Sequence, residues 1–147
     1  RVDDAVYMLA QLKSGALGTI VASKLATGTN DELEIRLYGE KGALRFNADY
    51  PGILEFYDNT DPDGPYGGSK GFKAIESVQR YERPGGMIPA PKLAIGWLRA
   101  HVHSLYTFFN CVYTGAAPSP SIADGVYNQY VLDMAAKSAE TGAWVTL

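Results

Sequence analysis

The chain has 147 residues, of which 46% are hydrophobic and 20% are charged, and its formal net charge at pH 7 is -3. These values are typical of one globular domain over residues 1–147 that can bury a core of ordinary size. The 13 Lys and Arg residues are scattered, and no apolar run approaches the roughly 20 residues that span a bilayer. We therefore expect neither a nucleic-acid partner nor a membrane partner.

The first residues pass directly from Arg1 into an apolar stretch, without an initiator Met or the charged and apolar prelude of a leader. An apolar run at the terminus needs neighbouring strands to cover it. We therefore expect the chain to be the second part of a longer protein. The single Cys111 cannot form an internal disulfide, which fits a reducing, cytoplasmic compartment.

The first half of the chain predicts a meander of antiparallel strands with short connections of the hairpin type. Within one of these segments, Glu34, Arg36 and Tyr38 alternate with apolar residues, so one face of the sheet should be exposed to solvent or covered by a partner. Residues rich in Asp, Gly and Pro predict a loop at 58–71, and prolines exclude regular structure at 83–92. The expected strands are 5–12, 17–27, 33–39, 43–48, 53–57 and an edge strand around 72–81.

The last third predicts two amphipathic helices. A second helix should begin after Ser121, which forms a capping-box pattern with Asp124, and end at Gly142 before a last strand at 143–147. The fold class is therefore α+β, with an open, mainly antiparallel sheet and two C-terminal helices packed on one face. The stripe of the first helix, which should lie on the sheet and end near Gly115, consists of Leu98, Val102, Leu105, Phe109 and Val112.

Motifs for nucleotide and metal binding are incomplete. No G-x-G-x-x-G or Walker pattern occurs, so the chain itself should bind no dinucleotide cofactor. Residues 59–64 match the start of a calcium loop, but Lys70 stands where a bidentate Glu is needed, so a solvated turn is preferred. His101 and His103 lie roughly 200° apart around a helix and cannot share a metal there. We therefore assign no metal ligand, and we interpret histidine here as core filling or pocket lining.

A hydrolase triad is equally unsupported, because no G-x-S-x-G elbow marks a nucleophile. Two further patterns are informative, one in the strand segments and one in the C-terminal third. The sequence reads KSGALG at 13–18 and EIRLYGEKGAL at 34–44, across two hairpins. An aromatic helix ends at Gly115, Pro118 follows, and SIADG at 121–125, VLD at 131–133, SAETG at 138–142 and WV at 144–145 complete the chain. In this order, the segments resemble the C-terminal domain of the Gfo/Idh/MocA oxidoreductases over nearly the whole chain.

The resemblance implies a division of labour. In that family, an N-terminal Rossmann domain binds NAD or NADP, and the C-terminal α+β domain forms part of the substrate pocket and commonly packs against another subunit. This chain would be the second domain of an oxidoreductase that acts on a sugar, polyol or related compound, and it would form a homo-oligomer through its open sheet face. The family's catalytic Lys and its Asp-x-x-x-His pair would lie before Arg1, so no catalytic residue is expected in the chain and the fragment alone should be inactive.

The resemblance also implies where substrate would be contacted. The loop 27–31 matches a position where family members place pocket-lining side chains, so Thr29, Asn30 and Asp31 are candidate substrate-binding residues. His101 stands where many members carry a Tyr, and Trp97 lies one turn earlier. An ordinary turn accounts for Asn and Asp in the loop equally well. The alternative function is a free-standing binding or assembly module that uses the open sheet face.

Overall fold

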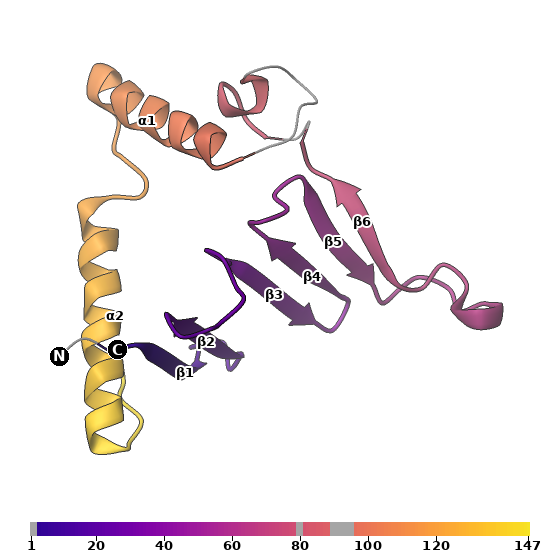
Figure 1. Ribbon diagram of the computed structural model, residues 1–147, viewed down its shortest axis with the longest axis horizontal. Coiled ribbons are helices and arrows are strands. Elements are labelled where there is room, and N and C mark those ends of the chain that lie inside the picture. The colour runs from indigo at the N-terminus through magenta and orange to yellow at the C-terminus, as the bar shows by residue number, and fades with distance from the viewer. Residues whose placement is uncertain (1–2, 79–80, 89–95) are drawn as a thin grey trace. The chain divides into compact units, whose positions relative to one another are not determined.

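A computed structural model describes residues 3–78, 81–88 and 96–147 (Figure 1). Predictions that fall on 79–80 and 89–92 lie outside the described residues. The elements, in chain order, are β1 (Ala5–Gln11), β2 (Leu17–Ser23), β3 (Glu34–Gly39), β4 (Gly42–Asn47), β5 (Ile53–Asp58), η1 (Pro65–Gly67), β6 (Phe72–Glu76), η2 (Gly85–Met87), α1 (Trp97–Thr114) and α2 (Ile122–Thr141).

The chain divides into two compact units. The first unit, Arg1–Thr29 with Ala117–Leu147, contains β1, β2 and α2. Strands β1 and β2 pair antiparallel from Ala5 opposite Ser23 to Gln11 opposite Leu17. Their hairpin closes through a hydrogen bond from the Leu12 amide to the Ala16 carbonyl at 2.8 Å. Gly15 adopts a φ of 88° in this turn, a conformation that favours glycine.

The second unit, Asn30–Ala116, contains the antiparallel meander β3-β4-β5-β6, visible in Figure 1, and α1. Residues paired across antiparallel strands share a face, so the register divides the sheet into two unlike faces. The apolar face consists of Ile35, Leu37, Leu44, Phe46, Leu54, Phe56 and Ile75, with Lys73 at one edge. The charged face consists of Glu34, Arg36, Arg45 and Glu55 together with Tyr38, Tyr57 and Phe72.

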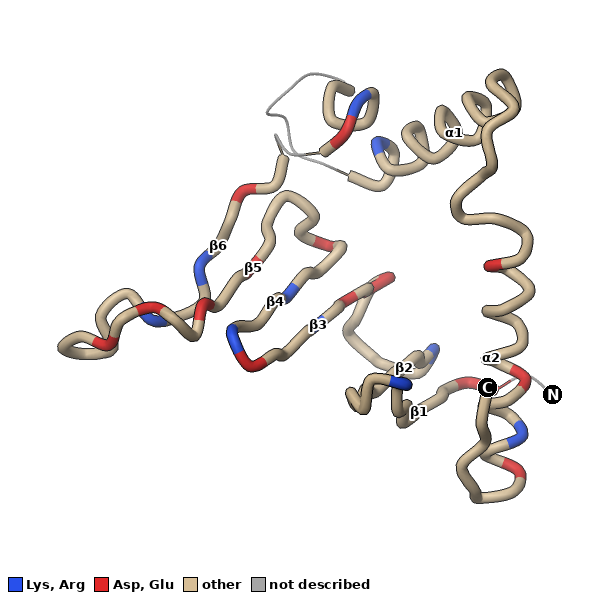
Figure 2. Tube along the Cα trace, turned by 180° about the vertical axis from the view of Figure 1, so that it is seen from behind, with Lys and Arg blue, Asp and Glu red and all other residues tan. Residues whose placement is uncertain are grey.

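Ionic and aromatic contacts are found on the charged face. The Arg36 guanidinium donates to both carboxylate oxygens of Glu34, at 2.7 and 3.0 Å. The Arg45 guanidinium lies 3.8 Å from the centroid of the Phe72 ring, a cation-π contact across the sheet. Figure 2 shows that both signs of charge occur along β3 to β6.

The α+β class is confirmed, with antiparallel strands and two C-terminal helices. Among the described residues the strands form two sheets, of two and four strands, and the second strand ends at Ser23 and not at residue 27. A turn follows, in which Gly28 has a φ of 94°. The predicted strand at 143–147 is wrong, since no strand forms there and the Ala143 carbonyl instead accepts a hydrogen bond from Ser138 Oγ at 2.6 Å. The expected edge strand around 72–81 ends at Glu76.

The predicted end of α1 and both predicted ends of α2 agree with the structure. Helix α1 ends at Gly115, which has a left-handed φ of 71° and donates its amide to the Cys111 carbonyl. Helix α2 begins at Ser121, which forms the predicted capping box with Asp124, and ends at Gly142 with a φ of 64°. Hydrogen bonds from the backbone and hydroxyl of Ser121 lower the pKa of the Asp124 carboxyl. Both ends of α2 and the C-terminal end of α1 therefore lie where local capping chemistry places them, whereas α1 begins after Gly96 without a side-chain cap.

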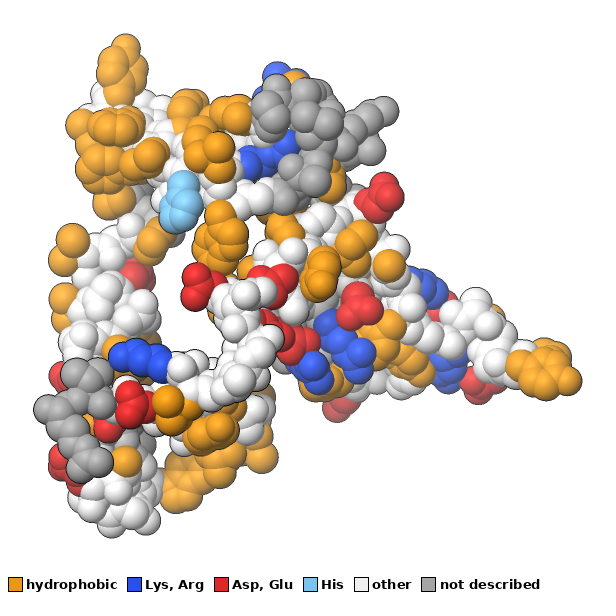
Figure 3. Space-filling view, in the orientation of Figure 1, with side chains coloured by type: hydrophobic (Ala, Val, Ile, Leu, Met, Phe, Trp, Pro, Cys, Tyr) orange, Lys and Arg blue, Asp and Glu red, His pale blue; other side chains and the backbone are white. Residues whose placement is uncertain are grey.

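The apolar stripe of α1 is exposed. Leu98, Phe109 and Val112 are 77%, 63% and 67% exposed, and no hydrophobic side chain is classed as buried within the described residues. Figure 3 shows hydrophobic side chains gathered over α1. Helix α1 instead contacts η2, with Arg99 and His103 on its polar side. Among the described residues, no helix is long and apolar enough to cross a membrane.

Candidate functional site

Trp97 and His101 stack against each other at the start of α1. They are four residues apart, so the helix places them on one face, one turn apart. Their ring centroids are 6.1 Å apart and their planes meet at 29°. Trp97 is 54% exposed, and His101 is also exposed. The pair therefore offers to a molecule from solution an exposed aromatic surface that includes the imidazole of His101.

The loop 27–31 forms a local turn. Thr29 donates from its hydroxyl to the Ala26 carbonyl at 2.8 Å and from its backbone amide to the same oxygen at 3.3 Å. The Asn30 carbonyl accepts the Glu32 amide at 2.8 Å. The side chains of Asn30 and Asp31 are exposed. Thr29 ends the first segment of one unit and Asn30 begins the other unit, so the loop spans the boundary between the two units.

In the acidic loop after β5, two carboxylates form ion pairs with lysines. Asp63 pairs with Lys70 at 3.1 Å, and Asp61 pairs with Lys73. Lys70 is the residue that stands where a calcium loop would need Glu, and here it neutralises one of the would-be ligands. Within the described parts of the chain, no group of three or more His, Cys, Asp or Glu residues could hold a metal ion.

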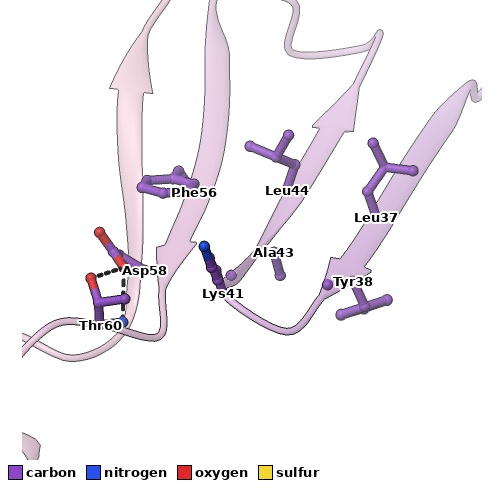
Figure 4. A pocket seen from close by; sticks show the side chains of 10 residues that line it. Leu37, Tyr38, Lys41, Ala43, Leu44, Phe56, Asp58 and Thr60 are labelled. Atoms are coloured by element: carbon purple, nitrogen blue, oxygen red, sulfur yellow. Dashed lines mark hydrogen bonds between the residues drawn. The ribbon is translucent and has the colours of Figure 1, made fainter.

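A hollow of about 560 Å³ opens beside the β3–β4 hairpin (Figure 4). Leu37, Leu44 and Phe56 of the apolar face line it together with Lys41 and the Asp58–Thr60 turn. The Asp58 carboxylate accepts the Thr60 amide at 2.8 Å and the Thr60 hydroxyl at 2.6 Å. These hydrogen bonds, the hydroxyl first, lower the pKa of Asp58. A carboxylate held in its charged form by its own turn is a poor general acid or base near neutral pH.

Sequence reasoning missed this hollow because its residues come from different strands. Leu37, Leu44 and Phe56 become neighbours only through the pairing register of β3, β4 and β5. The alternation along each strand was visible in the sequence, but the register was not.

The two histidines differ in their surroundings, although the sequence treats them alike. His101 stacks on Trp97 at the surface, whereas His103 is partly buried and accepts the Gly85 amide on Nδ1 at 3.2 Å. Arg99, which is 5% exposed, donates from Nε to the Ile88 carbonyl on the same side of α1 as His103. Arg99 had no sequence signal of its own, because its partner lies eleven residues away.

Comparison with known proteins places this arrangement in a family. Residues 1–147 match the Gfo/Idh/MocA domain described as "Oxidoreductase family, C-terminal alpha/beta domain". Levoglucosan dehydrogenase from Pseudarthrobacter phenanthrenivorans is 27% identical over 144 residues, which are 98% of this chain and 36% of that protein. The chain thus spans little more than a third of the relatives that it matches.

Solved structures of oxidoreductases also match this chain. An oxidoreductase domain protein from Kribbella flavida is 31% identical, with a TM-score of 0.84, and the match covers 98% of this chain and 37% of that one. Levoglucosan dehydrogenase in complex with NADH and L-sorbose gives a TM-score of 0.87 at 27% identity, over 98% of this chain and 38% of that one. The complex with NADH and levoglucosan gives 0.84 at 28% identity, with the same coverage of both chains. The chain therefore belongs to the Gfo/Idh/MocA family of oxidoreductases, in which it is a C-terminal domain.

Proposed function

We propose that this chain is the substrate-binding and assembly domain of an NAD- or NADP-dependent oxidoreductase that acts on a sugar, polyol or related compound. The supporting observation is the alignment of 98% of this chain with 38% of levoglucosan dehydrogenase, a protein whose structures hold NADH with levoglucosan or L-sorbose. In the intact enzyme, a hydride would pass between a carbinol carbon of the substrate and the nicotinamide ring. The chain carries no G-x-G-x-x-G pattern, so the cofactor would be bound by a separate Rossmann domain.

The substrate contacts of this domain would come from two features. Trp97 and His101 would receive a face of the substrate on their exposed rings, and a ring nitrogen of His101 would hydrogen-bond a hydroxyl. Thr29, Asn30 and Asp31 would contribute hydroxyl, amide and carboxylate groups from the loop. Aromatic surface combined with a few polar groups is the usual composition of a small-molecule pocket.

The charged face of the β3–β6 sheet would form the subunit interface, with a second copy of the chain as its partner. We expect the apolar face to be covered by other parts of the intact protein, because Ile35 and Leu37 on it are exposed and extended apolar surface marks a contact. The charged face bears Glu34, Arg36, Arg45 and Glu55, and both signs of charge allow two copies related by a two-fold axis to place acidic groups opposite basic ones.

The experiment on the substrate site uses the full-length protein that contains this domain. NAD and NADP reduction would be followed with levoglucosan and simple polyols, in the wild type and in the Trp97→Ala and His101→Ala variants. We expect each variant to raise the sugar KM by about tenfold and to leave the coenzyme KM unchanged, because these side chains would bind substrate and not nucleotide. Trp144→Ala, a matched loss of a Trp that is 69% exposed, should leave both constants unchanged.

Two results would contradict the proposal. An unchanged sugar KM in both Trp97→Ala and His101→Ala would remove these residues from the substrate site. Reduction of NAD or NADP by the isolated 147-residue chain would show that the division between two domains is wrong.

The alternative is a free-standing assembly module built on the exposed sheet face. The two functions differ in the reading frame upstream of Arg1. A strand followed by G-x-G-x-x-G, roughly 150 residues upstream, supports the oxidoreductase, whereas an unrelated domain or a stop supports the module.

A further inference from the structure

Helix α1 is held on its polar side by the short helix η2. His103 accepts the Gly85 amide on Nδ1 at 3.2 Å, and Arg99 donates from Nε to the Ile88 carbonyl. The two contacts use residues four apart on α1, which lie one turn apart on the same face. The two hydrogen bonds are made to the two ends of η2, because Gly85 is its first residue and Ile88 is its C-cap.

The hydrogen bond to Gly85 specifies the state of the imidazole. The amide of Gly85 is a donor, so Nδ1 of His103 must present a lone pair, and a neutral ring then carries its proton on Nε2. The contact therefore requires neutral His103 in the Nε2–H tautomer. An imidazolium would place a second donor against the Gly85 amide.

The contact also requires glycines in η2. A Cβ on Gly85 would lie 2.9 Å from both Cβ and Nδ1 of His103, and a Cβ on Gly86 would lie 2.1 Å from the Tyr81 carbonyl oxygen. Both glycines are buried. At Gly85 the backbone of η2 thus approaches the His103 side chain more closely than a Cβ would allow without a shift.

The same segment is tied to the sheet. Tyr81 donates its hydroxyl to the Pro51 carbonyl at 3.2 Å, and Ser77 Oγ donates to the same carbonyl at 3.0 Å. Pro51 lies in the connection between β4 and β5. Because Tyr81 also packs its carbonyl against Gly86, a continuous set of contacts leads from the sheet through η2 to His103 on α1.

The side of α1 that contacts η2, with Arg99 and His103, is opposite the side that carries Trp97 and His101. Trp97 and Arg99 are two residues apart, as are His101 and His103, which corresponds to roughly 200° around a helix. Fixing one side of the helix therefore sets where the other side stands relative to the sheet.

We infer that His103 is a positioning residue: by accepting the Gly85 amide, it seats α1 so that Trp97 and His101 are presented to the substrate. The inference rests on the function proposed above. It assigns to His103 no contact with substrate, and it predicts that the acceptor atom matters more than the imidazole ring.

The test uses sugar-dependent kinetics of the full-length protein. His103→Leu removes the acceptor at similar volume, whereas His103→Asn keeps one, because Asn Oδ1 lies close to the place of His Nδ1. We expect His103→Leu to raise the sugar KM about fivefold, the factor that corresponds to one lost hydrogen bond, with kcat and the coenzyme KM changed less than about twofold. His103→Asn should restore most of the sugar affinity. Gly85→Ala, whose new Cβ would press on the imidazole, should behave like His103→Leu.

The outcomes separate this inference from the proposed function. If Trp97→Ala raises the sugar KM but folded His103→Leu and Gly85→Ala do not, the positioning role is overturned and the substrate site stands. If Trp97→Ala and His101→Ala have no effect either, the substrate site itself fails. If His103→Asn is as impaired as His103→Leu, the acceptor role is overturned.

A measurement on the wild-type chain needs no variant. The nitrogen NMR shifts of His103 at neutral pH should show a proton on Nε2 and a free lone pair on Nδ1, and the Gly85 amide should exchange slowly with solvent. A proton found on Nδ1 would overturn the inference even if every variant failed to fold.

Discussion

Asp58 closes β5 with its carboxylate turned back onto the following residues. Its oxygen Oδ1 accepts both the amide and the hydroxyl of Thr60, and these two donors hold the pKa of Asp58 below its ordinary value. The hydroxyl is the larger cause. A group whose pKa is lowered by folding stabilises the folded state above its unfolded pKa of about 4, and this stabilisation is lost as the pH falls through the folded value.

Replacement of this hydroxyl gives a test at a single residue. Thr60→Val removes the side-chain donor and keeps the backbone amide, so the pKa of Asp58 should rise toward its ordinary value and remain somewhat below it. Carboxyl-carbon NMR titration of the chain measures the change. Asp124, whose pKa is lowered by Ser121 in α2, serves as the internal control and should titrate unchanged. An unaltered Asp58 titration in Thr60→Val would mean that the hydroxyl bond does not form in solution.

The candidate site was predictable from sequence only where spacing decides proximity. Trp97 and His101 are four apart on a helix, and the structure stacks them. His103 has its partner eighteen residues away in η2, a segment that the sequence described only as irregular. Such a contact depends on how the chain returns to the helix, and no local pattern encodes that path. The role of the loop residues Thr29, Asn30 and Asp31 stays a prediction.

At the scale of elements, α2 has two kinds of glycine. Gly125 lies inside the helix, with nothing within 4 Å of where a Cβ would stand. Gly142 caps the helix with a left-handed φ of 64°. A helix interior favours Ala over Gly, whereas a left-handed cap favours Gly over Ala, because a Cβ crowds the backbone in that conformation.

The same substitution should therefore have opposite effects at these two positions. We expect Gly125→Ala to raise the free energy of unfolding by about 0.5–1 kcal/mol, and Gly142→Ala to lower it by about 1 kcal/mol. Urea unfolding of the chain, followed by far-UV circular dichroism, measures both. A loss of stability in Gly125→Ala would mean that this side of α2 is packed against another surface in solution.

Elements were predictable to the extent that their signals are local. Both helix ends follow from caps, Ser121 at one end of α2 and Gly142 at the other, and the structure confirms them. Strands β1 to β5 follow from alternation and turn residues. The prediction of a strand at 143–147 was wrong, because a strand exists only when another strand pairs with it. The Ala143 carbonyl instead accepts a hydrogen bond from Ser138. Pairing is a tertiary property that a single segment does not carry.

At the scale of the whole molecule, the chain exposes more apolar surface than a soluble domain usually leaves uncovered. The stripe of α1 is exposed, and on the apolar face of the β3–β6 sheet Ile35 and Leu37 are 50% and 57% exposed. Extended apolar patches of this kind mark surfaces that contact other parts of a protein or other subunits. The chain spans about 37% of the length of the oxidoreductase domain protein that it matches.

The charged face gives the prediction that tests assembly. Arg36 is the most direct probe, because its guanidinium is half exposed and pairs with Glu34 on the face proposed for the second copy. Arg36→Glu would place two acidic groups side by side and opposite the partner's acidic groups, so we expect the dissociation constant of the dimer to rise at least about tenfold. Lys13→Glu, an equal charge reversal in the exposed β1–β2 hairpin, should leave assembly unchanged. Sedimentation velocity of the 147-residue chain at low and high salt measures both. A wild-type chain that is strictly monomeric, or a dimer that Arg36→Glu does not weaken, would place the subunit interface elsewhere.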